Sequence, residues 1–204
     1  MKAHRLGYWS SAAVATIGVV YIAALAAGFA RHGFREPITD PVLAIMEILT
    51  LLSAPALLLV IASIHDVAAP DRKIYGLIAV AFATLFTGIT CAVHFLELSA
   101  GRQLGNAGIV WPSRSYAAEL LAWDVFLGFA LLAAAASLEM TGVERTVSRL
   151  AAACGGLCVI GIVGPIVGDM RLQLIGVFGY AVLLPILALL LMRAFGKGPV
   201  RTGA

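Results

Sequence analysis

The sequence predicts an all-α integral membrane protein, a single domain formed by a bundle of six transmembrane helices with short loops. Apolar residues make up 61% of the 204 residues and charged residues only 12%, whereas soluble domains average about 45–50% and about 25%. The mean hydropathy is +0.99. A soluble chain of this size could not bury so much apolar surface, so the natural solvent for these residues is lipid.

Six apolar runs are long enough to cross a bilayer core of about 30 Å, which requires about 20 helical residues. The predicted spans cover residues 8–30, 42–64, 74–97, 116–138, 147–168 and 172–194. The first run follows two basic residues and ends in small ones, a pattern shared with cleaved signal peptides. Tyr8 and Trp9 are typical of an interfacial anchor, which favours a helix that is retained.

Helix boundary signals accompany the later runs. Asp40-Pro41 predicts an N-cap followed by a first-turn proline before the second span. Pro70-Asp71 precedes the third span, and Thr141-x-x-Glu144 reads as a capping box before the fifth. The longest loop, 98–115, joins the third and fourth spans and is either a lid or an ordinary interfacial loop.

Proline and glycine mark particular points within the spans. Pro55 and Pro185 should each free a backbone carbonyl and kink their helices. The fifth span is rich in glycine, and its Gly164-x-x-x-Gly168 spacing favours close helix packing.

The basic residues predict the orientation of the bundle. Nine lysines and arginines fall on the side that holds both termini and five on the other side. The positive-inside rule therefore places both termini in the cytoplasm of a cell with a bacterial-type inner membrane. Seven of the eleven acidic residues lie outside or in the outer half, and four lie inside.

Several classes of function are excluded or disfavoured. The three cysteines lie in apolar runs without a Cys-x-x-Cys pair, which argues against a disulfide framework or a redox dithiol. A formal charge of +3 is too small for a nucleic-acid partner. All lysines lie outside the apolar runs, which excludes a retinal Schiff base within the membrane. His65 and His94 are expected on opposite sides of the bilayer, which disfavours a haem bound between them. We expect no cofactor and no metal.

Polar side chains recur on single helix faces in the outer half of the bundle. The third span has four polar residues at spacings of 3, 4 and 3, which places them on one helix face. The sixth span has a similar series of residues on one face. The second and fourth spans add acidic residues at the same level, where ionisable groups are costly. We therefore predict a polar cavity open to the extracytoplasmic side, with these ligand-binding residues: Glu47, Thr90, His94, Glu97, Asp124, Gln173 and Tyr180.

Structural interpretations compete with this one. Glu97 and Glu119 could be solvated helix ends, and Asp169 an N-cap beside Arg171. Thr87 and Thr90 could bond to carbonyls of their own helix, and His94 to one carboxylate. Glu47 and Asp124 lie too far from helix ends to be caps.

Three functions fit these residues. The first is binding or transport of a small cationic or lipophilic ligand, although the site is shallow and no polar path continues toward the cytoplasm. The second is an intramembrane acid–base enzyme, an isomerase or a hydrolase, acting on a lipophilic substrate. The third is an accessory subunit that binds a partner, or a second copy, through the glycine-rich fifth span. The expected partners are membrane lipids and the ligand. A divalent metal held by His94, Glu97 and Glu47 would be a weak alternative.

Overall fold

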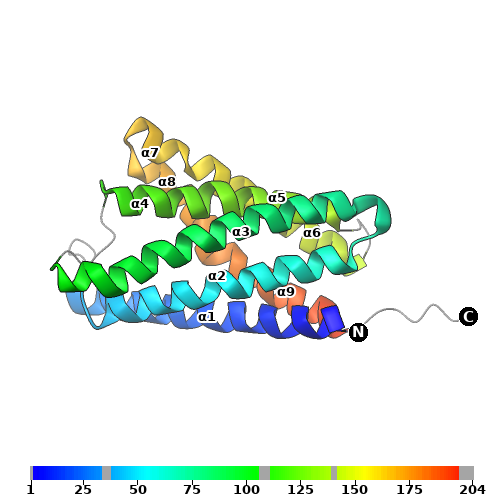
Figure 1. Ribbon diagram of the computed structural model, residues 1–204, viewed down its shortest axis with the longest axis horizontal. Coiled ribbons are helices and arrows are strands. Elements are labelled where there is room, and N and C mark those ends of the chain that lie inside the picture. The colour runs from blue at the N-terminus through cyan, green and yellow to red at the C-terminus, as the bar shows by residue number, and fades with distance from the viewer. Residues whose placement is uncertain (1, 34–37, 106–110, 139–141, 198–204) are drawn as a thin grey trace, which may run out of the picture.

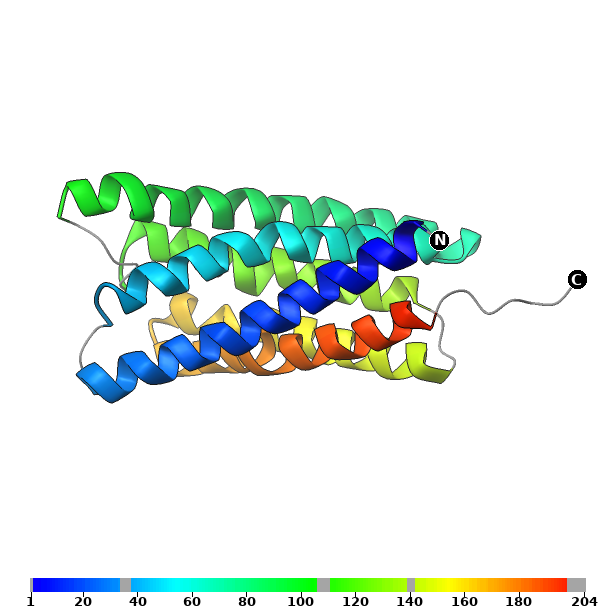
Figure 2. The same ribbon diagram turned by 90° about the horizontal axis from the view of Figure 1, so that it is seen from below.

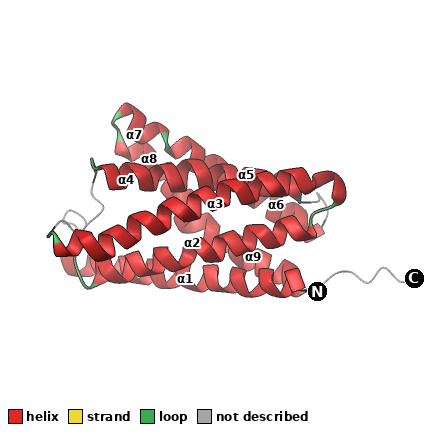
Figure 3. Ribbon diagram, in the orientation of Figure 1, coloured by secondary structure: helices red, strands yellow, loops and turns green. Residues whose placement is uncertain are grey.

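The computed structural model describes residues 2–33, 38–105, 111–138 and 142–197. The described residues are almost entirely helical and include no strand (Figure 3). They form six helical stretches that are long and apolar enough to cross a membrane, as the hydropathy pattern predicts. Several stretches change helix type along their length.

The first three stretches extend beyond the predicted ranges because polar residues at their ends remain helical. They consist of α1 (Lys2–His32), α2 (Val42–Val67), and the series η1 (Pro70–Arg72), α3 (Lys73–Leu96) and η2 (Glu97–Gly101). The last three stretches consist of α4 (Arg114–Leu120), η3 (Leu121–Phe126) and α5 (Leu127–Ser137); α6 (Gly142–Gly161) and α7 (Val163–Val167); and α8 (Met170–Val177), η4 (Phe178–Leu183) and α9 (Leu184–Gly196).

The six stretches form a closed ring. Each packs against the next along the chain, and α9 returns to pack against α1. The start of α1 and the end of α9 lie at the same end of the bundle, and α4, α7 and α8 lie toward the other (Figure 1). Figure 2 shows α1 crossing α2 and α9 obliquely.

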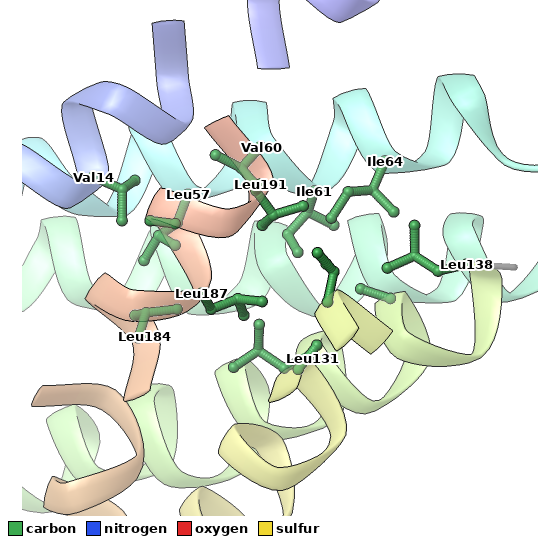
Figure 4. A pocket seen from close by; sticks show the side chains of 14 residues that line it. Val14, Leu57, Val60, Ile61, Ile64, Leu131, Leu138, Leu184, Leu187 and Leu191 are labelled. Carbon is green, nitrogen blue, oxygen red and sulfur yellow. The ribbon is translucent and has the colours of Figure 1, made fainter. Parts of the chain in front are cut away.

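The half of the ring nearer the termini contains a hollow lined by apolar side chains. Leu57, Leu131 and Leu187, from three different stretches, meet there beside Val14 of α1 (Figure 4). The hollow between them has a volume of only about 10 Å³, which is the lower limit for a single water molecule. This hollow therefore has no space for a ligand larger than a water molecule.

Pro55 has the predicted effect on hydrogen bonding in α2. Proline has no N–H, so the carbonyl of Leu51, four residues earlier, loses its usual donor. The Cys91 thiol of α3 lies 3.9 Å from this oxygen and donates to it. One turn away, the Thr87 hydroxyl donates to the carbonyl of Ala54 at 3.1 Å. The interpretation that Thr87 bonds to its own helix was therefore wrong, because a carbonyl of α2 lies within reach across the interface.

Helix beginnings match the sequence signals in part. Asp169 caps α8 by accepting the N–H of Arg171, as predicted. The helix after Asp40 begins at Val42 with Pro41 at the cap position, so Asp40 is not the N-cap, although its Oδ1 accepts the N–H of Ala44 at 3.1 Å. The predicted capping box cannot be compared, because Thr141 lies outside the described residues.

The longest predicted loop is shorter than expected because η2 continues α3 to Gly101 and the helix runs on to Gln103. The lid expected in this loop depends on residues 106–110, which lie outside the described part of the chain.

Glycines of α6 allow close packing inside the bundle. A Cβ on Gly155 would lie 2.6 Å from the carbonyl oxygen of Gly128, and one on Gly161 would lie 2.7 Å from the Cα of Gly176. A Cβ on Gly164 would similarly meet the backbone of the sixth stretch. Gly168 has a different role, because its φ of +79° terminates α7 in the left-handed region.

Candidate functional site

Three π-helical segments among the described residues each carry one of the seven polar residues that the sequence singled out. Glu97 lies in η2, Asp124 in η3 and Tyr180 in η4. π-Helical turns are rare and occur frequently at functional sites, because the extra residue displaces side chains from the regular face. Their coincidence with the polar residues makes this end of the bundle the candidate site.

The first group of contacts centres on Glu119, and we call it the Glu119 cluster. His94 Nε2 donates to Glu119 Oε1 at 2.9 Å, and Trp123 Nε1 donates to the same oxygen. Only 7% of the His94 side chain and 15% of the Glu119 side chain are exposed. The predicted bond of His94 to one carboxylate is therefore confirmed, although His94 Nδ1 has no partner among the described residues. The interpretation of Glu119 as a solvated helix end is wrong, because α4 begins at Arg114 and already holds Glu119 in its second turn.

Aromatic side chains lie near this carboxylate. The Trp123 ring contacts those of Phe86 and Tyr180, with centroids 5.0 and 5.1 Å away. Tyr21 of α1 and Tyr116 of α4 lie close enough to interact electrostatically with Glu119. The first span, which the sequence left out of the site, thus contributes a side chain to its surroundings.

Three buried polar atoms of this group have no hydrogen-bond partner among the described residues. They are Thr90 Oγ1, His94 Nδ1 and Glu119 Oε2. The interpretation that Thr90 bonds to its own helix is therefore wrong. Leaving a buried polar atom unpaired costs about 1–3 kcal/mol, so these atoms favour an additional polar partner.

The second group joins Asp124, Gln173 and Tyr180. Gln173 Nε2 donates to the Tyr180 hydroxyl at 2.9 Å and lies 3.4 Å from Asp124 Oδ2. Asp124 is completely buried and Gln173 is 2% exposed. The contact between the rings of Tyr180 and Trp123 connects this group to the Glu119 cluster.

The third group is an ion-paired cluster between the beginning of α2 and the end of η2. Arg102 donates to Glu47 Oε2 at 2.7 Å, to both oxygens of Asp40, and to the carbonyl of Glu97 at 2.9 Å. The guanidinium holds the pKa of the Asp40 carboxyl below its ordinary value. The two carboxylates raise the pKa of Arg102 in turn.

Glu97 was the other candidate for a solvated helix end, and it is buried. A Cβ on Gly101 would lie 3.1 Å from Glu97 Oε2, so the glutamate side chain lies along its own helix. The interpretation of Glu97 as a solvated end is therefore wrong, because the π-helix continues beyond it.

The structure thus distributes the seven predicted residues among separate contacts. Two hollows are prominent in the described part of the chain, and none of the seven lines either of them. The outer one is an apolar groove of about 320 Å³ between α4, η3, α6 and α7, bordered by Trp111, Leu121 and Ile166. The predicted polar cavity is not one of these hollows, which are lined by other, mainly apolar residues.

Sequence reasoning missed Trp123, Tyr21 and the pairing of Arg102. It treated Arg102 only as a charge that helps to set the orientation. The two carboxylates Asp40 and Glu47, one just before the second span and one in its second turn, could have signalled a cationic partner.

No three histidine, cysteine, aspartate or glutamate side chains in the described residues could together hold a metal ion. Two of the three residues considered as a weak metal site already have other partners: Glu47 binds Arg102, and His94 binds Glu119.

Comparisons of this chain with protein-family models, with curated proteins and with solved structures find no match.

Proposed function

We propose that this chain is an integral inner-membrane protein that binds a lipophilic organic cation in its outer half, at the Glu119 cluster. Insertion is supported by large apolar side chains that project from the bundle, such as Leu52, Ile166 and Leu174, with 56%, 75% and 61% of their surfaces exposed. The basic residues favour cytoplasmic termini, which puts the site on the extracytoplasmic side.

One observation carries the choice of ligand: the Glu119 carboxylate accepts the Trp123 N–H, lies close to Tyr21 and Tyr116, and has one oxygen without a partner among the described residues. Only histidine and tryptophan donate to this carboxylate in the described structure. A carboxylate beside aromatic side chains suits an ammonium or phosphonium ion with an apolar body, since both the charge and the ring quadrupoles attract it.

Binding is better supported than passage across the membrane. The half of the ring nearer the termini is closed by leucine, isoleucine and valine side chains, with no polar side chain at the hollow between them. An ion would be costly to place there.

Equilibrium binding to the purified full-length protein tests the proposal. Tetraphenylphosphonium and tetraphenylborate have nearly the same shape and hydrophobicity but opposite charge. We expect the cation to bind at least about tenfold more tightly than the anion, and Glu119→Gln to abolish this preference. Glu144→Gln, at an exposed glutamate of α6, is the matched control and should retain it. Equal binding of both ions, or an unchanged preference in Glu119→Gln, would contradict the proposal.

Insertion and orientation need separate measurements. The protein should remain with membranes after alkaline carbonate extraction. A C-terminal alkaline phosphatase fusion, which is active only outside the cytoplasm, should be inactive. Release from the membrane, or an active fusion, would contradict the insertion or the orientation.

The His94–Glu119 pair favours a second candidate, the acid–base enzyme. A histidine hydrogen-bonded to a carboxylate through Nε2, with Nδ1 unpartnered among the described residues, has the arrangement of a general base. Membrane lipid extracts incubated with the protein should then yield a product that His94→Gln does not form. Cation binding without any product would support the binding function alone.

A partner subunit or second copy on α6 remains a weaker proposal. Gly155, Gly161 and Gly164 are already covered within the chain, and Gly156 has open space around it.

A further inference from the structure

Asp124 lies at the contact between α6 and the last membrane-length stretch, which we call the glycine seam. Gly161 of α6 and Gly176 of α8 meet there with their backbones in contact. The Asp124 carboxyl enters from η3, so that a Cβ on Gly176 would lie only 2.5 Å from Oδ1 and a Cβ on Gly161 would lie 3.4 Å from it. The side chain is completely buried.

The hydrogen bonds of this carboxyl are too few for a charged group. Oδ2 has one long contact, 3.4 Å from Gln173 Nε2, and Oδ1 has no partner among the described residues. A buried carboxylate normally needs several donors or a cation, because its charge is otherwise very unfavourable away from water.

The titratable groups that face Asp124 do not supply a positive charge. They are Cys158 from α6, Tyr180 from η4 and Tyr116 from α4, all of which are neutral acids or become anionic. The ion pairs of the described residues do not include Asp124. On α3, which packs against η3, His94 is bound to Glu119.

We propose that Asp124 is a proton-binding site that is occupied whenever the glycine seam is closed. The space around Oδ1 is filled by glycine backbone, so a bound proton is the one compensating charge that needs no extra volume. Loss of the proton would leave a charge sealed between α6 and α8, so ionisation requires the seam to open and admit water. This inference does not depend on the ligand proposed for the Glu119 cluster.

Infrared spectroscopy of the purified full-length protein at neutral pH tests the proposal. A protonated carboxyl has a C=O stretch well separated from the bands of a carboxylate. The chain has five aspartates, and the other four (Asp40, Asp66, Asp71 and Asp169) are exposed. Incorporation of aspartate labelled with ¹³C at the side-chain carboxyl should therefore shift a protonated-carboxyl band that belongs to Asp124.

This measurement uses the unmodified sequence and does not depend on whether a variant folds. The labelled band should also be absent from Asp124→Asn and present in Glu119→Gln. A wild-type spectrum without a label-sensitive band of a protonated carboxyl would overturn the proposal, as would a band that persists in Asp124→Asn.

The pH dependence of stability supplies a second test. An asparagine side chain has nearly the same shape as a neutral aspartic acid, so the Asp124→Asn variant and the wild type should unfold at about the same temperature below the ordinary aspartate pKa of about 3.9. As the pH rises from there toward neutral, the wild type should lose stability relative to the variant, because Asp124 ionises in the unfolded chain but keeps its proton in the closed seam. A constant difference between about pH 4 and neutral pH would contradict the coupling between the proton and the closed seam.

Discussion

Arg102 Nη1 lies 2.7 Å from Oε2 of Glu47, whose side chain is only 3% exposed. The pair connects the end of the third membrane-length stretch to the beginning of the second. Glu47 Oε1 has no partner among the described residues, so this carboxylate depends on the guanidinium for compensation of its charge.

Removal of the guanidinium should therefore destabilise the protein strongly. We expect Arg102→Gln to lower the free energy of unfolding by about 3 kcal/mol, because it leaves a buried carboxylate without its cation. Unfolding of the purified protein in detergent, followed by circular dichroism, measures this loss. The double variant Arg102→Gln/Glu47→Gln should recover part of it, because the buried charge is then gone. Arg114→Gln, at an exposed arginine, is the control.

Asp40 predicts a dependence on pH at the same cluster. Because the hydrogen bonds from Arg102 lower its pKa from 3.8, Asp40 stabilises the folded state when it is ionised. This contribution is fully present above the ordinary pKa and is lost as the pH falls through the lower, folded-state pKa. The difference in melting temperature between wild type and Asp40→Asn should therefore vanish in strong acid. In the Arg102→Gln background the dependence should be weak, and a strong one would show that another group causes it.

The glycines of α6 predict a contrast between neighbouring positions. Gly161→Ala should lower the free energy of unfolding by about 1–3 kcal/mol, because its Cβ would lie 2.7 Å from the Cα of Gly176. Gly156→Ala has open space and should raise it by up to about 1 kcal/mol through helix propensity. Unfolding in detergent compares the two variants. Equal effects would show that the contact with α8 does not require glycine.

Thr87 predicts a smaller effect at the contact between α2 and α3. Thr87→Val removes the hydroxyl that donates to the Ala54 carbonyl and should lower the free energy of unfolding by about 0.6 kcal/mol. Thr84→Val is the matched control, because the exposed Thr84 hydroxyl bonds to a carbonyl of its own helix, that of Val80. A loss of the same size in both variants would contradict a specific role for the bond across the interface.

The membrane-length helices could be predicted because they depend on a local property. A run of about 20 apolar residues is visible without knowledge of its neighbours. The Asp169 cap was also predictable, because it involves residues adjacent in sequence.

The partners of the polar residues could not be predicted in the same way. They depend on how far each helix is rotated, and the π-helical turns of η3 and η4 shift the side chains that follow from a regular helical face. Glu119 looked like a helix end because the first turn of α4 is polar. Arg102 looked like a charged residue in a loop because the composition of η2 does not indicate that the helix continues through it.

The apolar interior around Leu57 and Leu187 has an electrical consequence. In a bilayer, a region packed mainly with apolar side chains behaves as a dielectric layer, and the membrane voltage falls mainly across it. A cation that reached Glu119 from outside would therefore cross little of the voltage drop. Full transfer of one charge across the membrane corresponds to about 2.3 kcal/mol per 100 mV. The binding free energy at this site should depend on membrane potential by only a small fraction of that amount.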